Sequence, residues 1–187
     1  MESLKALRRS CKERKIPIIS LATESFLGKL LRKQKPKICL EIGGAVGYSS
    51  IYIGELIHTW GGKITSFEIS YPAYQEGLQN SKKAHCYNII SYPYDVRYAP
   101  IKKLVESPVD FIFIDGQKSQ YGEYMEIIEK ISSPHTVIVI DDVIKYHNKL
   151  TSLYRYLKKK QMKYKILQLE PDDGVMIINT TKKNYTQ

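Results

Sequence analysis

Residues 37–50 read KICLEIGGAVGYSS, and this stretch decides the fold. The apolar run over residues 38–42 predicts a buried strand, and the apolar positions of residues 51–57 have the spacing of an amphipathic helix. Between them, Gly43 and Gly47 remove the side chain at two positions, so a cofactor can approach the bare backbone at a helix start. The stretch therefore predicts a strand, a turn and a helix that together bind a cofactor.

Acidic residues on both sides of the glycines indicate which class of cofactor the turn can bind. A second apolar strand, residues 63–67, ends in Glu68, about 20 residues past Gly47, where a carboxylate accepts hydrogen bonds from both ribose hydroxyls of a nucleoside. The glycine spacing matches neither the dinucleotide fingerprint G-x-G-x-x-G nor the P-loop. Glu41 precedes the glycines and would repel a pyrophosphate, but it suits a cationic ligand. A plain strand-to-helix connection without a ligand remains the alternative for the turn alone.

Two further apolar strands also end in acids. Residues 108–114 lead into Asp115, and residues 136–140 lead into Asp141 and Asp142. Apolar strands that alternate with helices predict a parallel sheet covered on both faces, and ligands bind at the carboxyl ends of such strands. We therefore expect these aspartates to lie on one rim, together with the acid that ends the second strand. A simple role in ending the strand is the alternative for Asp141 and Asp142.

The pattern E-x-G-x-x-x-G-Y-S, residues 41–49, resembles the first motif of S-adenosylmethionine-dependent methyltransferases. In particular it resembles the metal-dependent O-methyltransferases, which include catechol and caffeoyl-CoA O-methyltransferases and bacterial enzymes that methylate hydroxyuridine in tRNA. The resemblance covers about residues 16–180 and implies a single domain over residues 1–187 with an α/β, Rossmann-like methyltransferase fold. Such a fold has a mostly parallel seven-stranded sheet, helices on both faces and a terminal antiparallel hairpin, here residues 163–169 and 175–179.

The resemblance implies S-adenosylmethionine as the cofactor. It carries the cofactor-binding role over to Glu41, Gly43, Gly47, Tyr48, Ser49, Glu68, Asp95 and Asp115. Among these, Asp95 lies in a turn after the predicted strand 87–92 and corresponds to the acid beside the adenine ring. Acids in turns are also common for conformational reasons, which is the alternative for Asp95.

The same resemblance implies a divalent cation held by Asp115, Asp141 and Asp142. Carboxylates without His or Cys are hard oxygen ligands, which suit Mg²⁺ or a similar cation that keeps several waters. Relatives usually carry Asn at the position of Asp142. The third carboxylate of this chain therefore tightens metal binding, changes the preferred metal, or marks a site that has lost its metal.

The family pattern D-x-x-K-x-x-Y is matched by Asp115, Lys118 and Tyr121, which implies that Lys118 is the catalytic base. In the implied mechanism the cation lowers the pKa of the acceptor hydroxyl. Lys118, whose own pKa is depressed by the metal, takes the proton. The oxyanion then attacks the sulfonium methyl group in line, so that positioning does most of the work.

The acceptor is either a small hydroxylated, catechol-like molecule or a hydroxylated tRNA base. The formal net charge is +10, with 29 Lys and Arg against 19 Asp and Glu, and such an excess favours RNA through counterion release. The segment after Asp142 is shorter than in relatives, which predicts an open acceptor site that admits an RNA loop. An AT-rich coding sequence would also explain the lysines. Residues 1–15 form either a basic amphipathic helix or a loose arm.

Composition and the chain ends bound the remaining properties. Hydrophobic residues make up 43% of the chain, which is typical of a globular domain, and no apolar run is as long as a membrane span. No secretory signal is visible, and three cysteines without metal-ligand spacing favour a reduced, cytoplasmic protein. The resemblance also implies a homodimer, and residues 182–187 are expected to form a frayed tail.

Three other functions stay open. A methyltransferase that works without a metal would explain Asp142. A basic RNA-binding protein on a methyltransferase scaffold that has lost turnover would explain the net charge. A nucleotide-dependent dehydrogenase is disfavoured because the third glycine of its fingerprint is missing.

Overall fold

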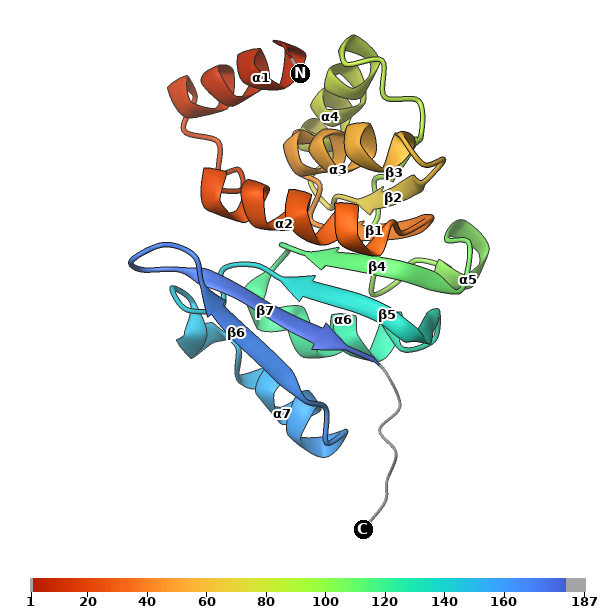
Figure 1. The fold of residues 1–187 in the computed structure, drawn as a ribbon, viewed down its shortest axis with the longest axis vertical. Coiled ribbons are helices and arrows are strands. Elements are labelled where there is room, and N and C mark those ends of the chain that lie inside the picture. Colours follow the sequence, from red (N-terminus) through yellow and green to blue (C-terminus); the bar gives the residue numbers. More distant parts are fainter. Residues whose placement is uncertain (1, 181–187) are drawn as a thin grey trace.

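Seven strands form one sheet in the order β3-β2-β1-β4-β5-β7-β6, as seen in a computed structural model that describes residues 2–180 (Figure 1). Neighbours among the first five strands pair in parallel, whereas β7 runs antiparallel to both β5 and β6. This arrangement confirms the predicted Rossmann-like methyltransferase sheet with its terminal antiparallel hairpin. The strands are β1 (Ile38–Ile42), β2 (Lys63–Phe67), β3 (Ile89–Tyr92), β4 (Val109–Ile114), β5 (Ser132–Ile140), β6 (Tyr164–Gln168) and β7 (Gly174–Asn179).

Helices lie on both faces of this sheet (Figure 1). The short α5 and two 3-10 turns, Lys118–Gln120 and His147–Lys149, were not expected from the sequence. The basic N-terminal segment is a helix over Glu2–Glu13, while the predicted frayed tail lies outside the described residues. The helices are α1 (Glu2–Glu13), α2 (Leu21–Gln34), α3 (Tyr48–His58), α4 (Tyr71–Lys83), α5 (Ile101–Leu104), α6 (Tyr121–Ile128) and α7 (Thr151–Lys159).

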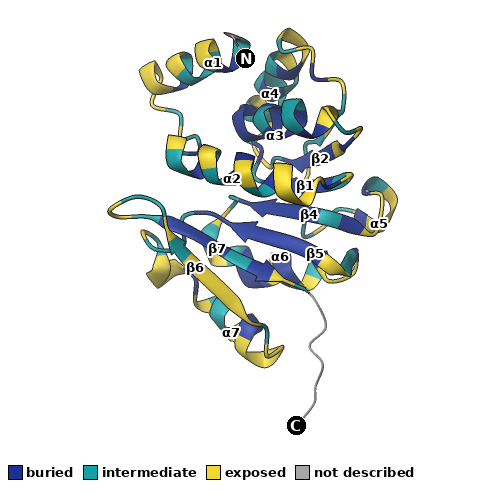
Figure 2. Ribbon diagram, viewed as in Figure 1, coloured by how far each residue is buried: buried dark blue, intermediate teal, exposed yellow. Residues whose placement is uncertain are grey.

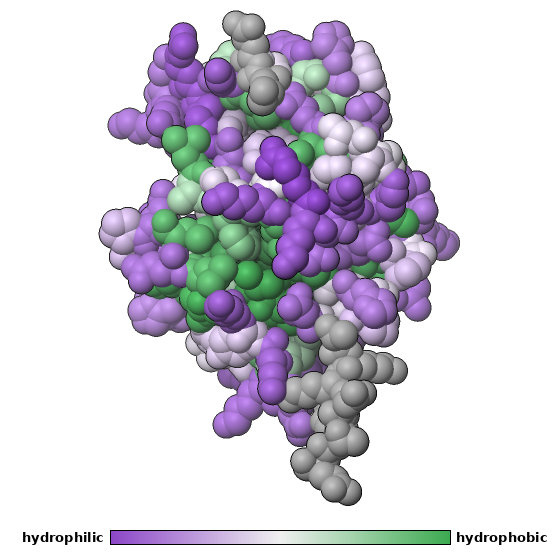
Figure 3. Space-filling model, viewed as in Figure 1, coloured by the Kyte–Doolittle hydropathy of each residue, from purple (hydrophilic) through white to green (hydrophobic). Residues whose placement is uncertain are grey.

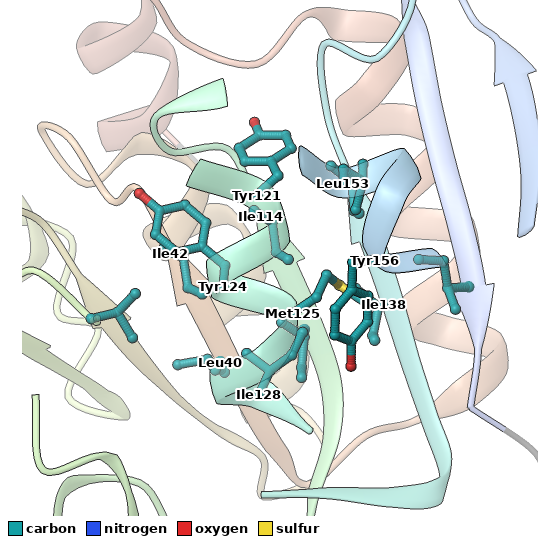
Figure 4. Close-up of a cluster of buried hydrophobic side chains, with 14 of the residues drawn as sticks. Leu40, Ile42, Ile114, Tyr121, Tyr124, Met125, Ile128, Ile138, Leu153 and Tyr156 are labelled. Carbon is teal, nitrogen blue, oxygen red and sulfur yellow. The ribbon is translucent and has the colours of Figure 1, made fainter. Parts of the chain in front are cut away.

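The sheet buries a core on each face because successive side chains of a strand point to opposite sides. In β1, Leu40 and Ile42 belong to the core under α6 and α7, whereas Cys39 belongs to the core under α2 and α3. Figure 4 shows Met125 and Ile128 of α6 among the side chains of the first core. Figure 2 shows that the central strands are buried along most of their length. Each fully buried aliphatic side chain stabilises the fold by about 1.5–3 kcal/mol.

Parallel pairing brings the carboxyl ends of β1, β2, β4 and β5 to one rim of the sheet. The amide of Asp115 donates to the carbonyl oxygen of Ile42 at 2.9 Å, and the amide of Asp141 donates to that of Ile114 at 3.0 Å. These bonds continue the strand ladders into the first residue after each strand. Glu68 follows β2 at the same level, so the acids predicted to share a rim do so.

An apolar patch lies on the face of the molecule shown in Figure 3, over α2 and the β6–β7 hairpin. Leu21 at the start of α2 is 62% exposed, and Ile166 of the edge strand β6 is 39% exposed. Lys163 precedes β6 and Lys165 lies within its exposed part, and lysines on an edge strand discourage pairing with another sheet. Within residues 2–180, no helix combines the length and apolar character that a membrane crossing requires.

Candidate active site

A cleft of about 790 Å³ opens at the carboxyl ends of the parallel strands. Its floor includes Gly43 and Ala45 of the loop after β1, and one wall is formed by residues 17–20 before α2. The segment that joins β6 to β7 also lines the cleft, through Leu169, Glu170, Asp172, Asp173 and Gly174. The volume is in the range of pockets that hold small-molecule ligands and cofactors.

Glu68 lies in the cleft and is fixed by the backbone. Its Oε2 accepts a hydrogen bond from the amide of Ala45 at 2.7 Å, and its Oε1 accepts one from the amide of Ser70 at 2.6 Å. Each carboxylate oxygen has a second lone pair, so the group can still accept hydrogen bonds from two ligand hydroxyls. The structure thus places Glu68 in the cleft with acceptor capacity left over, and its binding of ribose stays a prediction.

The backbone conformation of the first turn requires glycine at both positions, a reason that differs from the predicted close approach of a cofactor. Gly43 and Gly47 have φ values of 99° and 86°, which residues with a side chain rarely adopt. A Cβ at Gly43 would collide with the backbone of Asp115, and one at Gly47 would press on the backbone of Gly77 in α4. Gly43 lines the cleft, whereas Gly47 begins α3 against α4. The turn is therefore shaped by its own chain before any ligand approaches.

Glu41 lies beneath the floor of the cleft, and it is not a lining residue. Its side chain is fully buried, and its Oε2 accepts hydrogen bonds from the hydroxyl groups of Ser50 in α3 and Ser66 in β2. Burial raises the pKa of Glu41, against the opposing effect of these hydroxyls. The expectation of a direct contact with a cationic ligand is not supported by this position, since Glu41 instead joins α3 to β2 below the turn.

Tyr48 and Ser49 begin α3 and are also buried away from the cleft, with exposed fractions of 4% and 7%. The hydroxyl of Tyr48 donates to Oε2 of Glu24 at 2.6 Å and accepts a hydrogen bond from Nε of Arg8 at 2.8 Å. Sequence reasoning placed Tyr48 on the cofactor, but its polar atom faces α1 and α2. Some residues of the first motif therefore join neighbouring helices and strands, while others line the cleft.

Asp95 lines the cleft and is held by an ion pair. The guanidinium of Arg97 lies 2.6 Å from Oδ2 of Asp95, and the amide of Arg97 donates to Oδ1 at 3.0 Å. The hydrogen bonds from Arg97 lower the pKa of Asp95, with burial acting in the opposite direction. Asp95 is therefore a fixed carboxylate in the same half of the cleft as Tyr94 and Glu68.

Lys118 connects two of the three rim aspartates. Its Nζ lies 2.6 Å from Oδ1 of Asp115 and 2.8 Å from Oδ2 of Asp142. Burial alone would lower the pKa of Lys118, but the negative charges of Asp115 and Asp142 outweigh it and hold the pKa above its ordinary value. The depression of this pKa expected from the sequence needs a bound cation, because the carboxylates themselves act in the opposite direction.

The remaining acids of the rim lie close to this ion pair. Asp141 is 6% exposed, and burial, with smaller contributions from Asp115 and Asp142, raises its pKa to about 8. Asp142 has a φ of 60°, a conformation that Asn and Asp adopt more readily than other side chains. An aspartate therefore fits the backbone at the position where the resemblance implies Asn. Asp173, from the β6–β7 turn, lies beside Asp142 and raises the acid count further.

The donor set of this rim fits a hard divalent cation, but the ammonium group of Lys118 stands between two of the donors. Across residues 2–180, no three acidic, histidine or cysteine side chains converge as closely as metal ligands do. For Asp115 and Asp142 to share a cation with Asp141, Lys118 has to leave its position between them. The carboxylates of the rim are suitable metal ligands, but in this structure two of them pair with the ammonium group of Lys118.

Several residues of this region gave no usable signal in the sequence. Tyr146 lies at the mouth of the cleft with the Nζ atoms of Lys118, Lys145 and Lys149 at 5.1–5.8 Å from its ring centroid. These distances are typical of cation–π contacts. Arg8 is one of many basic residues of α1, so its partners could only be found in three dimensions. Asp173 was interpreted only as part of a turn.

A mostly parallel sheet with an antiparallel last pair, and a cleft that joins a ribose-type carboxylate to a rim of aspartates, define a methyltransferase-type α/β protein. Residues 1–184 match the model of the O-methyltransferase family, and the chain belongs to that family. Membership confirms, at the level of the family, the prediction of an S-adenosylmethionine-dependent O-methyltransferase.

Individual relatives agree with this assignment. The chain is 30% identical over 149 residues to a catechol O-methyltransferase of Niastella koreensis, an alignment that covers 77% of this chain and 67% of the relative. It is 29% identical over 152 residues to a caffeoyl-CoA O-methyltransferase of Stellaria longipes, covering 76% of this chain and 62% of the relative. The alignments thus span about two thirds of the length of these relatives.

Solved structures confirm the fold. An O-methyltransferase from Bacillus cereus in complex with SAH superposes with a TM-score of 0.81 at 23% identity, over 96% of this chain and 91% of the other. The O-methyltransferase TomG from Streptomyces achromogenes, in complex with SAM, gives a TM-score of 0.79 at 19% identity, over 96% and 90% of the two chains.

Proposed function

We propose that this protein transfers the methyl group of S-adenosylmethionine to a hydroxyl group of an acceptor bound at the aspartate rim. The acceptor is a small catechol-like aromatic molecule or a hydroxylated tRNA base. One observation carries the proposal: a single cleft contains both Glu68, suited to a ribose, and Lys118 with its aspartates, suited to an acceptor oxygen. Donor and acceptor can therefore meet in one enclosed space.

The residues of the cleft divide the work between them. Glu68 accepts the ribose hydroxyls, Asp95 stays ionised beside Arg97 at the same end, and Gly43 keeps the floor free of side chains. At the other end, Nζ of Lys118 lies where it could take the proton of the acceptor hydroxyl, once it has left Asp115 and Asp142 and released its own proton to solvent. Holding both reactants in line contributes most of the rate, because methyl transfer needs no other covalent chemistry from the protein.

Mg²⁺ or a similar cation belongs to this proposal. Asp115, Asp141 and Asp142 would hold it, and a bound cation supplies Lewis acidity that lowers the pKa of the acceptor hydroxyl. A second candidate, methyl transfer without a metal, is favoured by the observation that Lys118 already neutralises charge between Asp115 and Asp142. A homodimer and a tRNA acceptor, which the resemblance implied, stay proposals alongside the metal.

The decisive experiment measures tritiated methyl transfer from S-adenosylmethionine into a panel of catechols and into hypomodified tRNA, with and without EDTA. We expect incorporation into one acceptor class that EDTA abolishes and Mg²⁺ restores. Incorporation that survives EDTA would support the metal-free candidate. Binding of RNA with no incorporation into any acceptor, or failure to bind S-adenosylhomocysteine in calorimetry, would overturn the proposed activity.

A further inference from the structure

Arg8 of α1 joins three parts of the molecule at one point. Its Nε donates to the hydroxyl of Tyr48 at 2.8 Å, and its Nη2 lies 2.6 Å from Oε2 of Glu24 and 3.2 Å from the carbonyl oxygen of Ile19. The Tyr48 hydroxyl donates to the same Oε2 at 2.6 Å, which closes a triangle of three side chains. The guanidinium also stacks over the Tyr48 ring, with its central carbon 4.5 Å from the ring centroid.

Each partner of Arg8 belongs to a segment next to the cofactor half of the cleft. Ile19 is itself a lining residue, in the wall formed by residues 17–20. Glu24 follows Thr23, which also lines the cleft, in the first turn of α2. Tyr48 is the first residue of α3 and directly follows the turn over residues 43–47 that supplies the floor. Arg8 therefore binds wall and floor together from outside the cleft.

The contacts are protected enough to keep their geometry. The side chains of Arg8 and Glu24 are only 15% and 23% exposed, so water and salt screen the ion pair less than they screen a surface pair. The helix that carries Arg8 is itself fixed, because Leu4 is 7% exposed and belongs to the core under α2 and α3, and Cys11 is fully buried. Arg14 adds a two-pronged ion pair to Glu76 of α4 at 2.5 and 2.7 Å.

We propose that Arg8 is a positioning residue for S-adenosylmethionine: it acts through Glu24, Tyr48 and Ile19 to hold the 17–20 wall against the start of α3, without touching the cofactor. The inference rests on the proposed function, because it places the cofactor in this cleft. It also gives Tyr48 a role that differs from the direct contact expected from the sequence. Preorganised binding walls raise affinity because less ordering is needed when the ligand binds.

The test is a double-mutant cycle on the affinity for S-adenosylhomocysteine, measured by calorimetry below the melting temperature of every variant. Arg8→Met is expected to raise the Kd about tenfold, a size typical of coupling between sites. Tyr48→Phe removes only the hydroxyl and should also raise the Kd. The double variant should bind about as tightly as Arg8→Met alone, because both changes break the same triangle.

Measurements of kcat and KM distinguish a residue that positions the cofactor site from one that takes part in the chemical step or only stabilises the fold. For Arg8→Met, the KM for S-adenosylmethionine should rise with the Kd while kcat at saturating cofactor stays within about twofold of the wild type. Arg8→Lys keeps the charge but lacks the guanidinium fork, so it should not restore the affinity. Arg9→Met, at an exposed position of the same helix, is the matched control and should leave Kd and KM unchanged.

Three results would overturn the inference. An unchanged Kd in Arg8→Met, with only the melting temperature lowered, would show that Arg8 only stabilises the fold. Independent effects of Arg8→Met and Tyr48→Phe that multiply in the double variant would show that Tyr48 meets the cofactor by itself. Full recovery of the affinity in Arg8→Lys would show that only the positive charge of Arg8 matters, and not its contacts with Glu24, Tyr48 and Ile19. Failure of the wild-type protein to bind S-adenosylhomocysteine would instead strike the proposed function.

Discussion

The two halves of the cleft are built from different kinds of contact. At the cofactor half, Glu68 is fixed by two backbone amides, and Asp95 is fixed by both the amide and the guanidinium of Arg97. At the acceptor half, Lys118 and its aspartates hold one another through side chains alone. Backbone contacts move only with the fold, whereas an ion pair can release one charged partner when a ligand brings another charge to replace it. We therefore expect the cofactor half to be preorganised and the acceptor half to rearrange when a substrate or a cation replaces the contacts of Lys118.

The largest expected effect separates the two halves completely. Lys118→Met should lower kcat by about 10²–10⁴-fold, the range typical of a lost general base, because it removes the Nζ that lies beside Asp115 and Asp142. The Kd for S-adenosylhomocysteine, measured by calorimetry, should stay close to that of the wild type. Lys82→Met, at an exposed position on α4, is the control. Turnover that survives Lys118→Met would show that the acceptor half works without this lysine.

Glu68→Gln should show the reverse pattern. The amide keeps the shape of the side chain but loses the charge and one of the acceptor oxygens, and hydrogen bonds to charged groups are worth about 1.5–3 kcal/mol. The Kd for S-adenosylhomocysteine should therefore rise about 10- to 100-fold, while kcat at saturating cofactor changes little. Glu13→Gln on the exposed face of α1 is the matched control. An unaltered Kd would remove Glu68 from the cofactor site.

Competition between Lys118 and a divalent cation gives a smaller effect, measured without turnover. If the ammonium group and the cation occupy the same place, Lys118→Met should bind Mn²⁺ about tenfold more tightly than the wild type, because one positive charge near Asp115 and Asp142 is removed. Electron paramagnetic resonance of free Mn²⁺ measures this affinity directly. Asp115→Asn should weaken binding in the same assay. Equal Mn²⁺ affinity in the wild type and Lys118→Met would contradict shared occupancy.

The smallest effect tests the rigidity of the cofactor half through pH. Because Arg97 lowers the pKa of Asp95 in the folded protein, the pair stabilises the fold above the ordinary pKa of an aspartate and loses this contribution as the pH falls through the lowered value. Arg97→Met should therefore lower the free energy of unfolding at pH 7 by a small amount. Denaturant titrations at pH 7 and near pH 3 should show the difference shrinking at the lower pH. A constant difference would mean that Arg97 stabilises the fold by packing alone.

Much of the fold could be predicted because its signals are local. Continuous apolar runs, such as residues 137–140, that lie between helical patterns predict buried strands, and acids that directly follow parallel strands share a rim of the sheet. The structure brings Glu68, Asp115 and Asp141 to one cleft for that reason. The short α5 was missed because four residues carry too little periodicity to register.

The functional roles of single residues were harder to predict than their neighbourhood. Glu41 and Tyr48 belong to the first motif, yet both are buried. Glu41 accepts hydrogen bonds from hydroxyl groups of α3 and β2, and Tyr48 bonds to Arg8 and Glu24. A motif fixes the spacing of residues along the chain, but the side of a strand or helix that meets solvent depends on what packs against it. Sequence reasoning therefore located the cleft, while the cofactor-binding roles of Glu41 and Tyr48 stay predictions for residues that do not line it.

The sequence by itself determined the family, the order of strands and helices and the rim of acids, because hydrophobic periodicity and strand ends are written in consecutive residues. Only the tertiary structure decided that Lys118 stands between Asp115 and Asp142, and that Arg8 reaches from α1 to the first residue of α3. Both depend on residues far apart in the chain, or on rotamers chosen by burial and charge. These side-chain contacts depend on the electrostatic field and the packing of the folded molecule, and a local sequence pattern does not determine either.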